Sequence, residues 1–301
     1  MAKRRTASPK PPPNRIEESH VSISSSPALG IPTEAGSGIG SGARVTGLAL
    51  SGTRGVVLPL LLAFAVLLAW ELGVRLAHVP EVILPTPTAI VALVIDKHEI
   101  LWRHAVPTVL ESAAGFALAS LLGIGLAIVL SYSRLAREAL YPNLVFFQLI
   151  PKIALAPLFI IWLGIGTPSR LAFAVFISFF PVVIATTAGF ASVDRNMVRL
   201  CKSLTASEWQ TFTSVKFPSA LPYMFSGMKV AMTLAIIGVI IGEFITAQQG
   251  LGYLNVFATA RADTAVAMAA IAVLCAGGLL LYGLVAAAEA LANRIYGVPA
   301  G

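Results

Sequence analysis

The stretch RNMVRLCKSLTASEWQTFTSVKFPSALP, residues 195–222, decides the fold because it is polar and lies between long apolar stretches. A charged segment between two membrane spans cannot lie in hydrocarbon, where backbone and side-chain polar groups would lose their water. Its excess of Lys and Arg favours the cytoplasmic side. Met197–Glu208 has neither Gly nor Pro, which predicts about three helical turns. Pro218 and Pro222 should then stop the helix before the next span.

The composition of the whole chain agrees with a membrane protein. Of the 301 residues, 57% are hydrophobic and 12% are charged, with a mean hydropathy of +0.84. Because about a quarter of the residues of a soluble domain are normally charged, we expect an all-α polytopic membrane protein. The net charge of +7 lies in the N-terminal tail and in loops, so membrane topology explains it better than nucleic-acid binding.

Six apolar stretches are long enough to cross a bilayer as helices. They cover residues 56–77, 107–131, 140–165, 171–191, 225–247 and 266–291. Pro107 and Glu111 are expected in the first turn of the second span, where Pro is tolerated and a carboxylate meets the positive helix end.

Three domains follow from these stretches. Residues 1–54 are rich in Pro, Ser and Gly and predict a disordered cytoplasmic tail without a secretory signal. Residues 55–296 form the transmembrane domain, with its polar loop at 195–222, and 297–301 form a short C-terminal tail.

The charges of the loops predict the topology. The tail carries seven basic against three acidic residues, and 194–229 carries five against two, whereas 78–106 carries two against three. By the positive-inside rule, both termini and 195–222 face the cytoplasm and 78–106 faces outward.

Small residues recur at helical spacing in the fifth span. They are Gly227, Ala231, Ala235, Gly238 and Gly242. Such a stripe lets another backbone approach closely, so we expect helix packing along it, within the subunit or across a dimer. A second stripe at 115, 119, 123 and 127 predicts the same for the second span.

The third span is interrupted by Pro142, Pro151 and Pro157, and Lys152 lies near its middle. A broken helix at membrane depth is tolerated where it lines a cavity or is buried in protein. Lys152 therefore either lines a solute pathway or extends to the interface or to a carboxylate of another span. Gln148 and Glu243 are further candidates for the same pathway.

The loop at 195–222 resembles the cytoplasmic coupling loop of permease subunits of ATP-binding-cassette importers. Ala206, Ser207, Trp209, Val215 and Pro218 fit that family's pattern or its usual neighbours. The sequence departs from the pattern at two places, with Arg-Leu-Cys at 199–201 where Glu-Ala-Ala is usual, and Thr205 where Gly is usual.

The resemblance covers roughly residues 56–296. It includes PKIALAPLFIIWLGIG at 151–166, FFP at 179–181 and GEFITAQQGLGYL at 242–254. It is closest to the permeases of the nitrate, sulfonate and taurine group.

The resemblance implies a type I ABC-importer permease fold in the cytoplasmic (inner) membrane of a bacterium. It implies as partners an ABC ATPase subunit, which binds ATP, an extracytoplasmic solute-binding protein and a second permease copy, with a homodimer expected. The solute would be small, such as a sulfonate or another organic anion, a vitamin precursor or an aromatic acid. The residues implied to contact the ATPase are Arg199, Leu200, Cys201, Lys202, Thr205, Ala206, Ser207 and Trp209.

The sequence lacks the motifs of several other functions. No Gly-x-x-x-x-Gly-Lys-Ser/Thr loop is present, so we expect no ATPase site, no bound cofactor and no enzyme activity in this chain. The spacing of His78, His98 and His104 predicts no metal site, and Cys201 and Cys275 predict no disulfide.

Two rival functions remain. An ion-driven secondary transporter or channel needs carboxylates inside the membrane, but the candidate glutamates are expected toward span ends. A membrane anchor needs neither a broken span nor an intramembrane lysine.

Overall fold

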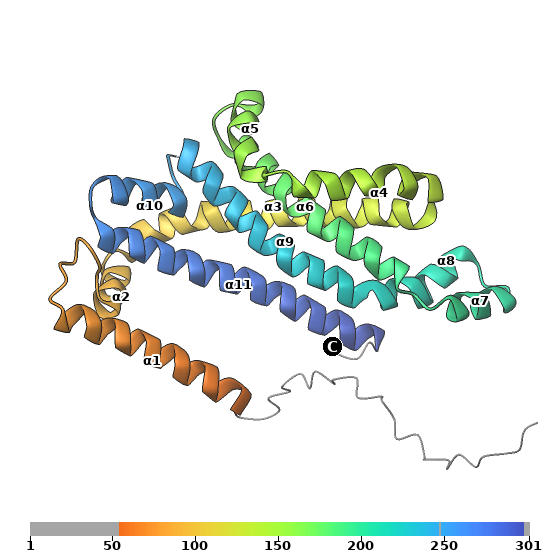
Figure 1. Ribbon diagram of the computed structural model, residues 1–301, viewed down its shortest axis with the longest axis horizontal. Helices are drawn as coiled ribbons and strands as arrows, with labels where there is room; N and C mark the ends of the chain where they lie inside the picture. Colours follow the sequence, from red (N-terminus) through yellow and green to blue (C-terminus); the bar gives the residue numbers. More distant parts are fainter. Residues whose placement is uncertain (1–53, 247, 298–301) are drawn as a thin grey trace, which may run out of the picture. The chain divides into compact units, whose positions relative to one another are not determined.

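The computed structural model describes residues 54–246 and 248–297, and this part of the chain is helical without strands (Figure 1). The helices are α1 (Arg54–Leu76), α2 (Pro87–Asp96), α3 (His98–Tyr132), α4 (Arg134–Leu149), η1 (Lys152–Leu155, a 3-10 turn), α5 (Ala156–Leu163), α6 (Thr167–Ala191), α7 (Arg195–Ser203), α8 (Glu208–Thr211), η2 (Phe212–Lys216, π-helical), α9 (Phe217–Thr246), α10 (Leu251–Ala260) and α11 (Thr264–Tyr296). Residues 1–53 of the tail predicted at 1–54 and the residues after Gly297 lie outside the described residues, whereas Arg54 begins α1.

Five helical runs are long and apolar enough to cross a membrane: α1, α3, α6, α11 and the run from α8 through η2 to the end of α9. The pair formed by α4 and the η1–α5 segment, bent by 89°, would be a sixth crossing. The predicted all-α fold with about six transmembrane helices is confirmed, and so is the break in the third span at Pro151. The predicted interruption at Pro142 is wrong, since α4 continues through this residue.

Helices α3, α6 and α9 pack closely because small residues face one another between them. An ideal Cβ built on Gly238 of α9 would lie 2.8 Å from the Cα of Ala174 in α6. One built on Gly123 of α3 would lie 2.9 Å from the Cβ of Val182 in α6. All five small residues predicted as the fifth-span stripe are buried. The close approach that the stripe permits is therefore made inside the subunit, against α6.

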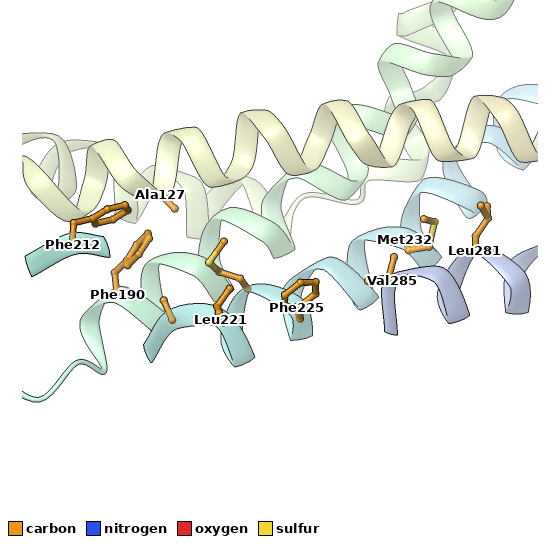
Figure 2. Packing of buried hydrophobic residues seen from close by; sticks show 10 residues of the cluster. Ala127, Phe190, Phe212, Leu221, Phe225, Met232, Leu281 and Val285 are labelled. Atoms are coloured by element: carbon orange, nitrogen blue, oxygen red, sulfur yellow. The ribbon is translucent and has the colours of Figure 1, made fainter. Parts of the chain in front are cut away.

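Larger apolar side chains fill the spaces beside these contacts. Figure 2 shows Phe190 of α6 and Phe212 of η2 near Ala127 of α3, while Met232 of α9 faces Leu281 of α11 farther along the same cluster. A second cluster joins α2, α3, α10 and α11 through Ile90, Leu101, Ala105, Leu251, Leu254, Ala269 and Ala270. Both clusters tie α11 to the three-helix core.

The start of the second span differs from the prediction. α3 begins at His98, so Pro107 lies inside the helix and Glu111 lies more than three turns from its start. The positive helix end therefore cannot stabilise the Glu111 carboxylate, because that effect fades within the first turn. Pro107 has no backbone N–H, so one carbonyl of the preceding turn loses its usual donor. Membrane helices tolerate such a proline where neighbouring groups satisfy the freed carbonyl.

The prediction that Pro218 and Pro222 stop the helix after the polar loop is also wrong. Pro218 lies in the first turn of α9, where no backbone N–H donor is needed, and the helix continues through Pro222. The π-helical turn η2 changes the hydrogen-bond register just before the two prolines. As a result α8, η2 and α9 form one run, Glu208–Thr246.

Candidate functional site

The segment Arg195–Thr211, which we call the coupling segment, contains two short helices instead of the single predicted one. α7 starts after Asp194, whose carboxylate accepts a hydrogen bond from the Asn196 N–H at 2.8 Å, and ends at Ser203. α8 starts with a capping box: Ser207 Oγ accepts from the Gln210 N–H at 3.1 Å, and Gln210 Oε1 accepts from the Ser207 N–H at 2.8 Å. The prediction of a helix over Met197–Glu208 is therefore wrong in extent, because these local caps compete with its continuation.

The turn between the two helices depends on Thr205, which has a left-handed backbone (φ 58°). The Ala206 N–H donates to the Cys201 carbonyl at 3.0 Å, and the Thr205 N–H donates to the Lys202 carbonyl at 3.1 Å. This pair of bonds is a Schellman motif, in which glycine is the favoured left-handed residue. The position at which the importer family usually has Gly is thus one that requires a positive φ, and threonine occupies it here at some cost.

An exposed apolar stripe runs along the coupling segment. Met197 and Leu200 are about half exposed, and Leu204 and Trp209 are each 70% exposed. Residues 197, 200 and 204 share one face of α7, since they are spaced by three and four. Exposed apolar side chains grouped between polar ones are typical of a protein interaction surface.

The coupling segment is attached to the helical core by Trp209 and Glu208. The Trp209 ring stacks on the buried Phe212 ring with centroids 5.8 Å apart. Glu208 lies 3.3 Å from Lys202 and 4.0 Å from Lys216, so one carboxylate joins α7 to η2. Of the predicted ATPase contacts, Cys201 and Ala206 are partly buried, and Arg199, Leu200, Lys202, Thr205, Ser207 and Trp209 are exposed.

A buried ion pair joins α3 to α6. Arg170 Nη2 and Nε donate to the two oxygens of Glu111 at 2.6 and 2.8 Å, and Thr167 Oγ1 donates to Glu111 at 2.9 Å. Both charged residues are less than 10% exposed. Sequence analysis missed Arg170 because the fourth span was taken to start one residue later; an arginine at the start of an apolar span was the available signal.

Glu243 lies at the end of α9, 1% exposed, and holds the start of α10. Its carboxylate accepts from Thr108 Oγ1 at 2.6 Å and from the Gly252 N–H at 2.7 Å. The Leu251 N–H donates to Thr108 Oγ1 at 2.9 Å. Gly250 has a positive φ of 118°, and a Cβ there would overlap the Glu243 carboxylate. The glycines of Gly-Leu-Gly thus let a carboxylate reach the helix N–H groups.

A second missed pair joins α9 to α11: Lys229 Nζ lies 2.5 Å from Glu289 Oε2. The described residues contain no group of three or more His, Cys, Asp or Glu side chains that could hold a metal ion.

Lys152 and Gln148 lie at the bend between α4 and α5. Lys152 Nζ donates to the Gln148 backbone carbonyl at 3.0 Å and lies 5.1 Å from the centre of the Phe180 ring. No carboxylate of the described residues lies within 4.0 Å of this ammonium. Within the described ranges Lys152 thus has no carboxylate partner, and the Glu243 carboxylate is bonded to Thr108 and Gly252 instead.

The sequence is similar to that of known transport proteins. The family described as "Binding-protein-dependent transport system inner membrane component" matches residues 119–295. A probable ABC transporter permease protein of Haemophilus influenzae is 35% identical over 224 residues, which are 74% of this chain and 91% of that protein. The riboflavin transport system permease protein RibX of Chloroflexus aurantiacus is 34% identical over 241 residues, 79% of this chain and 88% of that protein.

The fold is also similar to that of a solved structure. A chain of an amino acid ABC transporter, crystallised with histidines, superimposes with a TM-score of 0.52 at 13% identity. The match covers 66% of this chain and 96% of that one. At this identity the likeness concerns the fold alone.

Proposed function

The chain belongs to the family of binding-protein-dependent transport system inner membrane components, as a permease subunit of an ABC importer, and from this we propose that its coupling segment is the surface an ATPase subunit grips. Permeases of this family lie in the inner membrane with several crossings and work with an ATPase and a substrate-binding protein. The chain is accordingly a transport subunit. ATP would be bound by the partner ATPase and no cofactor by this chain.

The observation that carries the proposal is the exposed apolar stripe of the coupling segment, which continues into a membrane helix. Trp209 belongs to α8, and α8 continues through η2 into α9 without a break. A displacement of α8 by a partner would therefore be passed along a helix that packs on α6 and α3. ATP binding would shift the permease between conformations by favouring one of them.

Two further features of the assembly belong to this proposal. The excess of basic residues around the coupling segment supports its placement in the cytoplasm, with both termini on the same side.

Two copies of the permease, as a homodimer in the lipid bilayer, would enclose the solute pathway between them. A large exposed apolar surface on α5, including Ile161 and Trp162, supports contact with another apolar surface.

The proposed solute is a small organic molecule delivered by an extracytoplasmic binding protein. The similarity to a riboflavin permease supports a vitamin or vitamin precursor, and sulfonates and aromatic acids remain alternatives within the resembling group. The relatives are ABC transporter permeases and give no support to the rival function, a secondary transporter; two of the intramembrane glutamates also have cation partners. Glu111 is bound to Arg170 and Glu289 to Lys229, so neither is free to carry a proton or an ion.

The test of the coupling proposal is Ala206→Arg. Ala206 follows Thr205 in the turn of the coupling segment, so an Arg side chain there would add bulk and charge to the proposed contact. Overpacking costs roughly 1–3 kcal/mol, which corresponds to about a five- to hundredfold loss of ATPase affinity. The measurement is the amount of ATPase that co-purifies with the permease, together with the rate of ATP hydrolysis.

The matched control is Ala139→Arg, which adds the same side chain on exposed α4, outside the coupling segment. It should leave the co-purifying ATPase unchanged. If Ala206→Arg is well expressed and retains wild-type ATPase and hydrolysis, the coupling segment is not the gripping surface.

A further inference from the structure

Lys152 is an intramembrane cation without a carboxylate partner in the part of the chain that the structure describes. Other charged side chains of the membrane helices form ion pairs, for example Glu71 with Arg75, Glu111 with Arg170, and Lys229 with Glu289. Lys152 instead donates to the Gln148 carbonyl, which leaves two of its three N–H groups without an acceptor among the described residues. A cation held in this way inside a membrane protein is costly unless a further negative group pairs with it at some stage.

The depth of Lys152 restricts what that group can be. Its ammonium lies over the ring of Phe180, which is 11 residues before the end of α6 at Ala191. At 1.5 Å per residue this is about 16 Å along the helix, near the middle of a hydrocarbon layer about 30 Å thick. Lipid headgroups lie at the surface of that layer. Lys152 is intermediate in exposure, so a negatively charged solute in transit is a group that can reach it at this depth.

An aromatic run extends from Lys152 along α6 to the end of α5. Phe180 contacts Phe176 with ring centroids 5.5 Å apart, and Phe176 contacts Phe159 at 5.4 Å. Phe159 in turn contacts Trp162 at 5.7 Å, and Trp162 is 68% exposed. Phe159 and Phe176 are partly exposed, so the run presents ring surface on which a planar molecule can stack.

The broken helix places these two features together. The backbone turns sharply between α4 and α5 (Figure 1). The bend is 89°, and Lys152 is the first residue of η1 at this bend. Discontinuous helices near the midplane are where transporters expose backbone polar groups and charges to a solute.

We propose that Lys152 and the aromatic run form a solute-binding site of the translocation pathway that takes an aromatic anion, with the ammonium on the anionic group and the rings against the planar part. This inference rests on the proposed function as a permease, and it names the class of solute. An aliphatic anion would use the charge without the rings, and an aromatic cation would be repelled.

The experiment uses the permease–ATPase complex in lipid nanodiscs, with binding measured by equilibrium dialysis and corrected for empty nanodiscs. The probes are naphthalene-2-sulfonate, cyclohexanesulfonate and 2-naphthylmethylamine. We expect the aromatic anion to bind more tightly than either of the other two. Lys152→Gln should weaken that binding roughly tenfold or more, since a charged hydrogen bond is lost, whereas Lys152→Arg should retain most of it.

Two further variants separate the rings from the charge. Phe176→Leu should reduce the preference for naphthalene-2-sulfonate over cyclohexanesulfonate, because it removes stacking surface and keeps the ammonium. Lys97→Gln removes the same charge outside the aromatic run and should change nothing.

The outcomes separate this inference from the proposed function. Equal binding of naphthalene-2-sulfonate by wild type and Lys152→Gln, or no binding at all by a complex that retains its ATPase, would overturn the site. Equal binding of the two sulfonates by wild type would overturn the aromatic preference. Failure of the wild-type permease to retain an ATPase would count against the proposed function instead.

Discussion

Thr205 is the residue whose backbone conformation fits its side chain least well. A left-handed conformation costs a residue with a Cβ about 1–2 kcal/mol, and glycine avoids this cost. Thr205→Gly should therefore stabilise the turn between α7 and α8 by about 1 kcal/mol. In the purified permease, hydrogen exchange of the Ala206 amide should slow about fivefold, because that amide is held by the Cys201 carbonyl.

The control for Thr205 is an exposed threonine with ordinary helical geometry. Thr233 lies inside α9, and Thr233→Gly should speed hydrogen exchange in its own turn, since glycine loses more conformational freedom in a helix. Faster exchange at Ala206 in Thr205→Gly would show that the threonine side chain stabilises the turn by contacts that outweigh its backbone strain.

The Glu111–Arg170 pair makes a second prediction at the scale of single residues. Removing one partner of a buried pair leaves a charge without compensation, which costs about 3–5 kcal/mol. Glu111→Gln should therefore lower the thermal unfolding midpoint of the detergent-purified permease clearly. Glu138→Gln removes a partner from the exposed Arg134–Glu138 pair and should cost about 0–1 kcal/mol. Equal shifts in both variants would show that the buried pair contributes no more than an exposed one.

The helices that sequence could predict are those whose apolar length alone identifies them. The membrane spans belong to this group. The break at Pro151 was predicted from its proline, and the polar segment between α6 and α9 from its charges. α2 and α10 were not predicted as helices, because ten residues are too few to show a membrane span. The start of α10 also depends on Glu243, a residue from another helix, and no local pattern reports such a contact.

The candidate sites were also predictable to different degrees, because some features follow from local sequence and others depend on contacts between distant helices. The position of the coupling segment follows from its charge between apolar spans. Its division into α7 and α8 depends on the left-handed Thr205 and the capping box at Ser207, which a count of helix-forming residues does not weigh. Arg170 and Phe180 acquire their partners only when α6 packs on α3 and on the α4–α5 bend.

The contact between α6 and α9 gives a prediction at the scale of elements. Any side chain at Gly238 meets the Ala174 backbone, since even a Cβ would lie at 2.8 Å. Gly238→Leu should force the helices apart, cost roughly 1–3 kcal/mol or more, and lower the yield of folded permease. The measurement is the monodisperse fraction and unfolding midpoint after purification.

Gly283 is the matched control, because an added Cβ there meets nothing within 4 Å. Gly283→Leu should leave yield and unfolding midpoint close to wild type. A folded, stable Gly238→Leu permease with normal uptake would show that α6 and α9 do not rely on close approach at this point.

At the scale of the whole permease, one helical run connects the coupling segment with the contact between α9 and α10. It starts at Glu208 in the coupling segment and passes the close contacts of Gly227 and Gly238. Near its end Glu243 accepts a hydrogen bond from the Gly252 N–H at the start of α10. Small residues fix this helix against α6 over most of its length, so it cannot slide without moving α6. A displacement at α8 should therefore be transmitted to the α4–α5 bend, because Phe180 of α6 contacts Lys152 there.

The orientation of the permease in the membrane gives the last prediction. Coupling to a cytoplasmic ATPase requires Cys201 inside, and the basic residues around it favour this placement. Asp96 is exposed at the end of α2, in the segment expected outside. In spheroplasts, a membrane-impermeant thiol reagent should label Asp96→Cys and should spare native Cys201 until the membrane is opened. Cys275 lies within the membrane helix α11 and should stay unlabelled in both states. Labelling of Cys201 in intact spheroplasts, with Asp96→Cys protected, would reverse the orientation and separate the coupling segment from any cytoplasmic ATPase.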